Sequence, residues 1–342
     1  MAVKTGNYTY LLENTPSVLS FGAVGSKKES EGPLGQYFDV INPDSSFGES
    51  SWEKAESKMV QISVGQALSK GNFEADQIDM AFAGDLLNQC IGSVYGLRDL
   101  GIPFVGLYGA CSTMAESLAL AALFVDTSIA KKALAVTSSH FCSAERQFRF
   151  PLEYGGQRTP TAQWTATASG AVVLTSGSVK GPRVTHVTLG KVVDKGITDA
   201  NNMGAAMAPA AYDTLTAHFR DTGRSPGFYD LIVTGDLGML GHEIVTDFFR
   251  QDGVDLANYN DCGLLLFDCK GQDVHCGASG CGCAAAVLTT SLIPGLISGK
   301  WKNLLFCPTG ALLSPTSTQQ GESIPSVCHA VALTAPAQGG EA

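Results

Sequence analysis

One cysteine stands where the chain could carry out covalent chemistry. The turn Gly109-Ala110-Cys111-Ser112 lies between an apolar run and a long apolar helix. At a helix N-terminus, unpaired N–H groups and the helix dipole favour negative charge, and this setting lowers the pKa of a thiol. The same turn can bind a carboxylate or a phosphate without any reaction. The sequence therefore leaves two interpretations of Cys111: a nucleophile, or a wall residue of an anion site.

A second group of candidates lies in a polar and aromatic segment, residues 138–167, which we predict to be a loop. In a chain poor in cations it holds His140, Arg146, Arg149, Arg158 and Trp164. The planar fork of arginine suits a carboxylate, because it bonds both oxygens. The alternative is that these arginines pair with acids such as Glu145 and Glu153 at a subunit interface.

The cysteines offer a weaker signal. The chain contains ten of them, and for a long chain with an ample apolar core we expect reduced, buried thiols. The segment with His275, Cys276, Cys281 and Cys283 lacks the paired CxxC spacing of zinc sites, so no metal site is predicted.

Composition limits the classes of function. The 342 residues carry 22 Lys+Arg against 32 Asp+Glu, a net charge of −10, which argues against a nucleic-acid surface and against loose binding to anionic lipid. No signal peptide and no apolar stretch of about 20 residues is visible, so we expect a soluble protein.

The spacing of apolar residues predicts elements that position these candidates. Helices are predicted over 52–69, Thr113–Asp126, 240–250 and 284–292, and strands over 263–267 and 327–333, among others. Residues 25–50 are predicted to be a long loop. Two halves, 1–180 and 181–342, share one plan: strand, tight small-residue turn, fully buried helix, strand, long loop, strand. This alternation predicts an α/β sandwich with two buried central helices.

At this point the residues resemble a known superfamily. Cys111 on its strand-to-helix turn, His275 just before Gly277-Ala278-Ser279-Gly280, and Cys307 with Gly310 at the end of a late strand resemble the thiolase and ketoacyl-synthase superfamily. The run 139–158, Gln163-Trp164, Cys281-Gly282-Cys283 and the segment 319–325 look like the stage V sporulation protein AD family within it.

The resemblance implies a thiolase-like duplicated αβαβα fold and a task other than standard thiolase chemistry. It implies a protein that binds dipicolinic acid, as the free acid or as its calcium chelate, within the set of proteins that moves this compound into the spore and releases it at germination. Membrane-spanning proteins of that set are the implied partners. A homodimer is expected, with 25–50 and 138–167 near its interface. The implied location is the cytoplasm or forespore, at the inner spore membrane through those partners.

The superfamily's catalytic positions match only in part. Cys111 matches the nucleophile and Cys307 the late acid/base cysteine, whereas His275 is displaced by one residue and Val274 stands at the expected offset. Where the superfamily has an asparagine or histidine, this chain has Gly235-Asp236. The plainer interpretations are a core histidine for His275, a packed thiol for Cys307, and a helix cap for Asp236.

Three hypotheses follow. The first is a non-catalytic dipicolinate-binding protein without a cofactor, in which the anion site occupies the old acyl pocket. Its predicted ligand-binding residues are Cys111, His140, Arg146, Arg149, Arg158, Trp164 and Ser279. The second is an acyltransferase or condensing enzyme that uses Cys111 as acyl acceptor, with His275 and Cys307. The third is a structural subunit whose pocket is vestigial.

Overall fold

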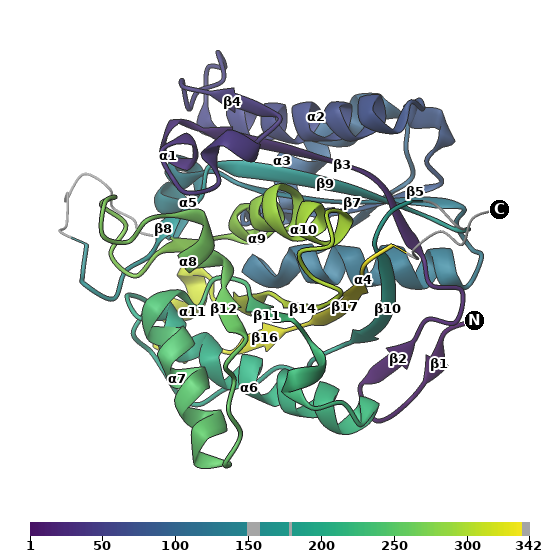
Figure 1. The fold of residues 1–342 in the computed structure, drawn as a ribbon. Coiled ribbons are helices and arrows are strands. Elements are labelled where there is room, and N and C mark those ends of the chain that lie inside the picture. Colours follow the sequence, from purple (N-terminus) through teal and green to yellow (C-terminus); the bar gives the residue numbers. More distant parts are fainter. Residues whose placement is uncertain (149–157, 178–179, 337–342) are drawn as a thin grey trace.

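The computed structural model describes residues 1–148, 158–177 and 180–336. A 13-stranded sheet forms its framework and divides into two halves of the same plan, here called the N-terminal sheet and the C-terminal sheet (Figure 1). The strands of the N-terminal half follow the order β3 (Ser17–Ser26), β9 (Ala168–Thr175), β7 (Lys132–Ser139), β5 (Met80–Gly84) and β6 (Phe104–Gly106). Those of the C-terminal half follow the order β10 (Arg183–Thr188), β17 (Ala330–Thr334), β14 (Asn303–Cys307), β11 (Leu231–Thr234) and β12 (Tyr259–Asp261).

The pairing repeats from one half to the other. In each half the first two pairings are antiparallel and the last two are parallel. The halves meet where β3 and β10 lie side by side, with Ser17 opposite Arg183. This repeated order is the duplication that the sequence pattern predicted.

The helices form three further layers (Figure 1). Between the sheets lie α4 (Thr113–Asp126) and the run α9 (Cys281–Val287), a π-helical turn (Leu288–Leu292) and α10 (Ile293–Ile297). Outside the N-terminal sheet lie α2 (Trp52–Gly71) and α3 (Ile91–Leu97), and outside the other lie α6 (Met203–Thr222) and α7 (Gly238–Gln251). The α/β sandwich with two buried central helices that the sequence predicted is confirmed.

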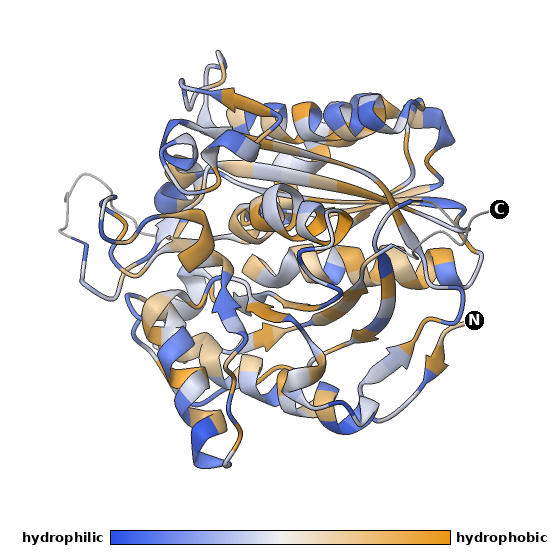
Figure 2. Cartoon of the chain, viewed as in Figure 1, coloured by the Kyte–Doolittle hydropathy of each residue, from blue (hydrophilic) through white to orange (hydrophobic). Residues whose placement is uncertain are grey.

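The central helices are buried because small residues let two sheets approach them from both sides. All seven residues of α9 are buried, and α4 is buried along Met114, Ala115, Leu118 and Ala122. In Figure 2 the hydrophobic colouring is concentrated in these central layers, while hydrophilic residues gather on the outward turns of α7. The predicted buried helix at Thr113–Asp126 has the predicted bounds.

Shorter elements connect these layers. The remaining helices and strands are β1 (Val3–Lys4), β2 (Thr9–Leu11), α1 (Lys27–Ser30), β4 (Val40–Asn42), α5 (Phe141–Phe148), β8 (Trp164–Thr165), α8 (Cys262–Leu266), β13 (Ala278–Ser279), β15 (Thr309–Ala311), α11 (Pro315–Gln319) and β16 (Ser326–Cys328). Single 3₁₀ turns lie at Gly35–Tyr37, Ala75–Gln77, Asn88–Cys90, Arg98–Leu100, Ala110–Ser112 and Pro226–Phe228.

Four sequence predictions about elements were wrong. The predicted loop 25–50 contains helix α1 and strand β4, which pairs in parallel with β3. Residues 263–266 belong to helix α8, Phe267 is extended just after it, and the strand is the polar segment Tyr259–Asp261 just before it. The predicted loop 138–167 contains helix α5. The predicted strand 327–333 is divided into β16 and β17. A short apolar run fits a buried helix as well as a buried strand, and its neighbours decide between them.

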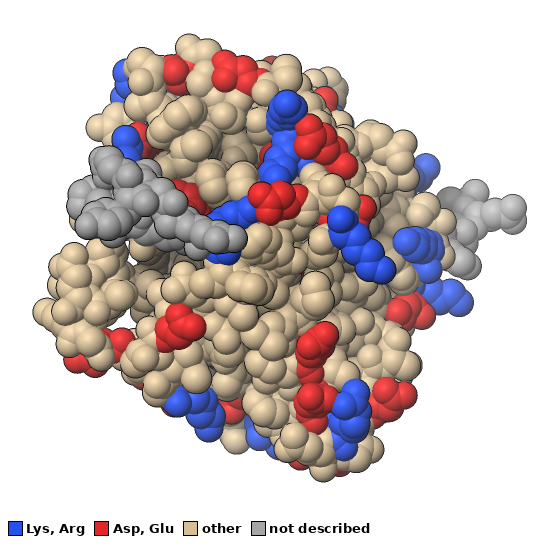
Figure 3. Space-filling model, turned by 90° about the vertical axis from the view of Figure 1, so that its left-hand side faces the viewer, with Lys and Arg blue, Asp and Glu red and all other residues tan. Residues whose placement is uncertain are grey.

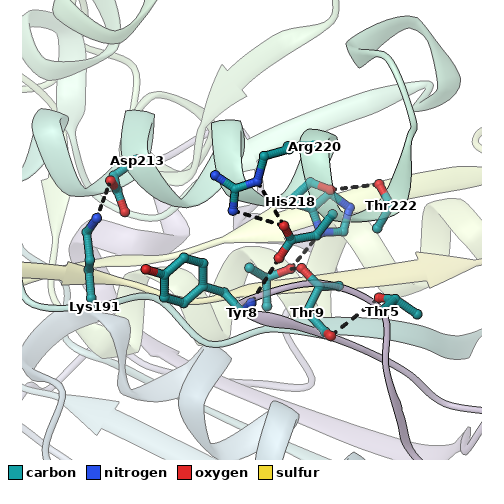
Figure 4. Close-up of polar contacts among 10 residues, drawn as sticks. Thr5, Tyr8, Thr9, Lys191, Asp213, His218, Arg220 and Thr222 are labelled. Atoms are coloured by element: carbon teal, nitrogen blue, oxygen red, sulfur yellow. Dashed lines mark hydrogen bonds and ion pairs between the residues drawn. The ribbon is translucent and has the colours of Figure 1, made fainter.

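The N-terminal arm is attached to the C-terminal half. β2 pairs with β10, and the backbone N–H of Tyr8 donates to the carboxylate of Asp221 on α6. Behind this contact, the hydroxyl of Thr9 lies 2.9 Å from that of Thr188, which in turn lies 2.7 Å from Nδ1 of His218 (Figure 4). The arm is therefore held by a buried polar chain as well as by strand pairing.

Candidate functional site around Cys111

Cys111 lies on the turn between β6 and α4. Ala110, just before it, has a left-handed φ of 49°, and its carbonyl accepts a hydrogen bond of 2.6 Å from the Thr113 hydroxyl. The same hydroxyl accepts a hydrogen bond of 3.0 Å from the backbone N–H of Gly109. These bonds hold a strained turn in place, and the side chain of Cys111 is left partly exposed.

The equivalent turn of the other half faces Cys111. It runs from β13 through Gly280 into α9, and the hydroxyl of Ser279 lies 4.0 Å from the sulfur of Cys111. Gly280 has a φ of 100°, and a Cβ there would lie 2.6 Å from the hydroxyl of Ser139. Only glycine fits, so the two helix N-termini meet at one point.

Asp236 is the third member of this cluster. Its buried carboxylate accepts hydrogen bonds from the Thr309 hydroxyl at 2.9 Å, from the Ser279 hydroxyl at 3.2 Å and from the N–H of Gly280 at 3.4 Å. The carboxylate therefore occupies the anion position that the N-terminus of α9 offers.

The interpretation of Asp236 as a helix cap was wrong. The carboxylate of Asp261 fills that role, accepting hydrogen bonds of 3.0 Å from the N–H groups of both Leu237 and Gly238 at the start of α7. β11 and β12 are parallel and in register, with Thr234 opposite Asp261. Because Asp261 reaches α7 from the neighbouring strand, Asp236 is free to turn toward Cys111.

The electrostatics of the cluster oppose a thiolate. Burial, together with the charge of Asp236, raises the pKa of the Cys111 thiol well above its usual value. Burial raises the pKa of Asp236 itself to about 6, and the nearby charge of Asp261 acts in the same direction. At neutral pH Cys111 is thus a thiol beside an acid, whereas an activated nucleophile needs a base or a cation beside it.

A cavity of about 70 Å³ opens beside this cluster. Its polar lining comprises Cys111, Thr161, Gln163, Thr165, Asn201, Asp236 and Ser279, together with Glu145. The remaining wall is largely apolar and aromatic, with Leu86, Tyr108, Phe148, Met207 and Leu313. Within the described part of the chain, the charged residues that line it are Glu145 and Asp236, both acids.

Among the predicted ligand-binding residues, the structure brings together Cys111 and Ser279. It does not bring His140 to the cavity. Nε2 of His140 lies 2.8 Å from the carbonyl of Ser45, and Nδ1 accepts a hydrogen bond from the N–H of Cys142. Since both ring nitrogens are engaged by backbone groups, and burial lowers the pKa of the imidazole, His140 is a satisfied neutral histidine away from the site.

The predicted arginines and Trp164 also lie away from the cavity. Arg146, on the exposed side of α5, pairs with Glu53. Arg158 pairs with Asp273 at 2.7 Å and lies over the ring of Trp164, which stacks on Phe141 at 3.8 Å. The prediction that Arg146, Arg158 and Trp164 line the pocket beside Cys111 was therefore wrong, because acidic and aromatic side chains outside this pocket engage them. Arg149 lies outside the described residues.

The other two catalytic candidates lie elsewhere. Nδ1 of His275 is 2.6 Å from the carbonyl of Thr159, and Nε2 is 3.3 Å from Asp273, at a surface beside Arg158. Cys307 is fully buried at the end of β14 and does not line the cavity. The structure thus groups neither of them with Cys111.

Two contributors to the site were not among the predicted site residues, although the sequence offered Gln163 and the ring of Phe148 within the candidate segment. Gln163, at the end of the segment 138–167, donates from Nε2 to the carbonyls of Asp236 and Ala278 and ties the two halves together. Helix α5 supplies Ala144, Glu145 and Phe148 to the cavity wall. The helical spacing of Phe141, Ala144 and Phe148 was the available signal for α5.

The site can be compared with known proteins once its geometry is described. A sequence model of the stage V sporulation protein AD (SpoVAD) family matches residues 6–334. The Bacillus subtilis (strain 168) protein named stage V sporulation protein AD is 46% identical over 330 residues, which are 96% of each chain.

Solved structures show the fold. The 3-oxoacyl-[acyl-carrier-protein] synthase III of Aquifex aeolicus aligns with a TM-score of 0.56 and 13% identity, covering 93% of this chain and 99% of that one. A single-residue variant of OleA from Xanthomonas campestris aligns with a TM-score of 0.59 and 13% identity, covering 95% of this chain and 99% of that one. The likeness to these enzymes is one of fold. By sequence and by fold together, the chain belongs to the stage V sporulation protein AD family of sporulation proteins.

Proposed function

We propose that this chain is a non-catalytic dipicolinic acid-binding protein of the machinery that takes dipicolinate into the spore and releases it, acting in sporulation and germination. The observation that carries the proposal is the carboxylate of Asp236 beside Cys111. A condensing enzyme needs a group beside its cysteine that activates the thiol. Asp236 instead raises the pKa of the Cys111 thiol and so disfavours the reactive thiolate.

The cavity suits a flat ring better than a reacting thioester. Tyr108, Phe148 and Leu313 offer an apolar and aromatic wall. The carboxyl group of Asp236, with its pKa of about 6, donates a hydrogen bond to a ligand carboxylate whenever it is protonated. In its ionised form it is an oxygen ligand of the kind that calcium prefers, so the calcium chelate of dipicolinate is the second ligand form to test.

The alternative function is an acyltransferase or condensing enzyme with Cys111 as acyl acceptor. Its support is the position of Cys111 at the start of α4 and the condensing-enzyme fold. Against it, His275 and Cys307 do not reach the cavity. The face in Figure 3 shows Lys and Arg interspersed with Asp and Glu, rather than a continuous basic surface for a nucleotide head group.

The proposal includes partners. We expect peripheral association with the inner spore membrane through membrane-spanning proteins of the same transport set. Within the described residues, no helix has the length and apolar character needed to cross a membrane.

We further propose a homodimer through the edge strand β6. This strand ends the N-terminal sheet, and all three of its residues are exposed, Phe104 and Val105 among them. An exposed apolar edge strand offers unpaired N–H and C=O groups to a second strand. If β6 of a second copy paired antiparallel with this strand about a two-fold axis, the exposed edges of both copies would be covered.

Titration calorimetry of the purified protein tests the ligand. Dipicolinate, with and without calcium, is compared with pyridine-2-carboxylate and acetyl-coenzyme A. We expect heat from dipicolinate and none from acetyl-coenzyme A. The variant Cys111→Phe should fill the cavity and abolish the heat, whereas Cys142→Phe, a partly exposed cysteine outside the cavity, should not. Acetyl transfer onto Cys111 without dipicolinate binding would establish the enzyme instead.

A further inference from the structure

Two carboxylic acids are buried directly behind the wall of the Cys111 cavity. Glu56 on α2 and Asp85 at the end of β5 are both fully buried. Gly92 lies between them: a Cβ there would lie 3.2 Å from Oδ2 of Asp85 and 3.2 Å from Cγ of Glu56. Two carboxylates packed against one glycine repel each other strongly when both are ionised.

The two acids have different partners. Asp85 accepts hydrogen bonds from the N–H of Leu87 and from both the N–H and the hydroxyl of Ser93, at 2.7–3.0 Å. Glu56 accepts one hydrogen bond from each of two serine hydroxyls, Ser138 at 3.1 Å and Ser143 at 2.8 Å. Backbone N–H groups favour the charge on Asp85, so Glu56 is the member of the pair that we expect to stay protonated to higher pH.

No cation offsets this pair among the groups described around it. The titratable groups that interact with it from the packed elements are Cys90, Tyr108 and Cys281. Arg146 of α5 forms its ion pair with Glu53 at the surface. Burial and the charge of Asp85 raise the pKa of Glu56 to about 8.

The pair touches both segments that form this side of the cavity. Ser143 precedes Ala144 on α5, and Asp85 precedes Leu86; Ala144 and Leu86 line the cavity and pack together with Cys281. Gln147 of α5 binds the same segments, since its Nε2 donates to the carbonyl of Leu86. A change in the ionisation of the acid pair can therefore alter the cavity wall through both segments, at Ala144 and at Leu86.

We propose that Glu56 is a positioning residue: in its neutral form it holds α5 against the cavity, and its ionisation at higher pH loosens this wall and weakens ligand binding. The inference rests on the proposed function for its ligand. The ionised pair places two charges beside Gly92 without a counterion among the described groups around it, and displacement of Glu56 away from Asp85 relieves their repulsion. This displacement moves the carboxyl group to which Ser143 of α5 is hydrogen-bonded.

Dipicolinate titrations between pH 7 and pH 9 test the proposal, because the carboxyl groups of the ligand stay ionised over this range. We expect the apparent Kd of the unmodified protein to be about tenfold weaker at pH 9 than at pH 7. Glu56→Gln should keep its pH 7 affinity within about twofold and lose the pH dependence. Asp85→Asn removes the charge that raises the pKa of Glu56, so Glu56 should ionise at lower pH. Because no second charge then stands beside it, the loss of affinity should become smaller and begin at lower pH. The matched control is Glu29→Gln, another fully buried acid, which contacts Ser26 and Thr167 instead and should keep the normal profile.

A measurement without ligand separates this inference from the proposed function. Trp164 stacks on Phe141, the first residue of α5, so its fluorescence reports the seating of that helix. In a Trp52→Phe, Trp301→Phe background we expect the emission to change between pH 7 and pH 9, and to stay constant when Glu56→Gln is added. A Glu56→Gln protein that keeps the normal pH profile in both measurements would overturn the proposal. Absence of dipicolinate binding at every pH would overturn the proposed function and leave the fluorescence test intact.

Discussion

The hydroxyl of Ser279 donates a hydrogen bond of 3.2 Å to the carboxylate of Asp236. Ser279 belongs to the turn that faces Cys111, so this bond fixes an acid beside the thiol. An imidazole at this point would draw the thiol proton away, whereas a carboxylate disfavours the thiolate.

Removing the charge of Asp236 should make Cys111 more reactive. In Asp236→Asn the thiol loses the negative neighbour that raises its pKa, while the raising effect of burial remains. We expect alkylation of Cys111 by iodoacetamide at pH 8 to become at least about threefold faster. The same assay on Cys111→Ala gives the background from the other cysteines. An unchanged rate would show that Asp236 does not control the thiol.

A charge on the edge strand should separate the proposed dimer. Val105 lies in the middle of β6, and Val105→Lys places an ammonium group in the proposed strand pair. We expect sedimentation analysis to show a dimer for the unmodified protein. For the variant, the dissociation constant of the dimer should be at least about tenfold larger. Val192→Lys, at a valine exposed elsewhere, is the control. A monomer without any substitution contradicts the proposed interface.

Gly310 should tolerate no side chain. A Cβ on this residue of β15 would lie 2.0 Å from the carbonyl oxygen of Gly109, on the turn that carries Cys111. Gly310→Ala should lower the free energy of unfolding by about 1–3 kcal/mol in urea titrations. At Gly65, an exposed position of α2 with open space around it, the same change should stabilise by up to about 1 kcal/mol. Equal effects at the two glycines would refute this account.

The buried His218 should reduce stability in acid. Nδ1 of His218 (Figure 4) is engaged by the hydroxyl of Thr188, and Nε2 by the hydroxyl of Tyr229. Burial lowers the pKa of His218 to about 3. Because the folded state prefers the neutral imidazole, the stability it contributes is full above pH 6.5 and is lost as the pH falls toward 3. At pH 5 the loss is about 2 kcal/mol.

Urea titrations at pH 7 and pH 5 check this expectation. Between these pH values, His218→Gln should lose about 2 kcal/mol less unfolding free energy than the unmodified protein. His242→Gln, a histidine on α7 that stacks on Tyr259, should match the unmodified protein. Buried acids with raised pKa values, such as Glu29, act in the opposite direction, so the difference between proteins is the quantity to compare.

The sequence determined the repeated plan and the elements at its centre. The runs of small and apolar residues around Thr113–Asp126 and after Gly280 fit only helices buried on all sides, because no polar face remains to meet water. The turn with Cys111 follows from the same pattern. Local sequence is sufficient for these segments because a helix that is apolar on every side can lie only in the central layer, between the two halves of the sheet.

Only the tertiary structure decided the partners of the polar side chains. The roles of Asp236 and Asp261 depend on the register of β11 and β12, which puts Asp261 beside Thr234 and within reach of α7. His140 and Arg158 are engaged by Ser45 and Asp273, far away in the chain. The physical reason is that a hydrogen bond or an ion pair needs its atoms within about 3 Å, and strand register and helix packing between distant segments set that distance.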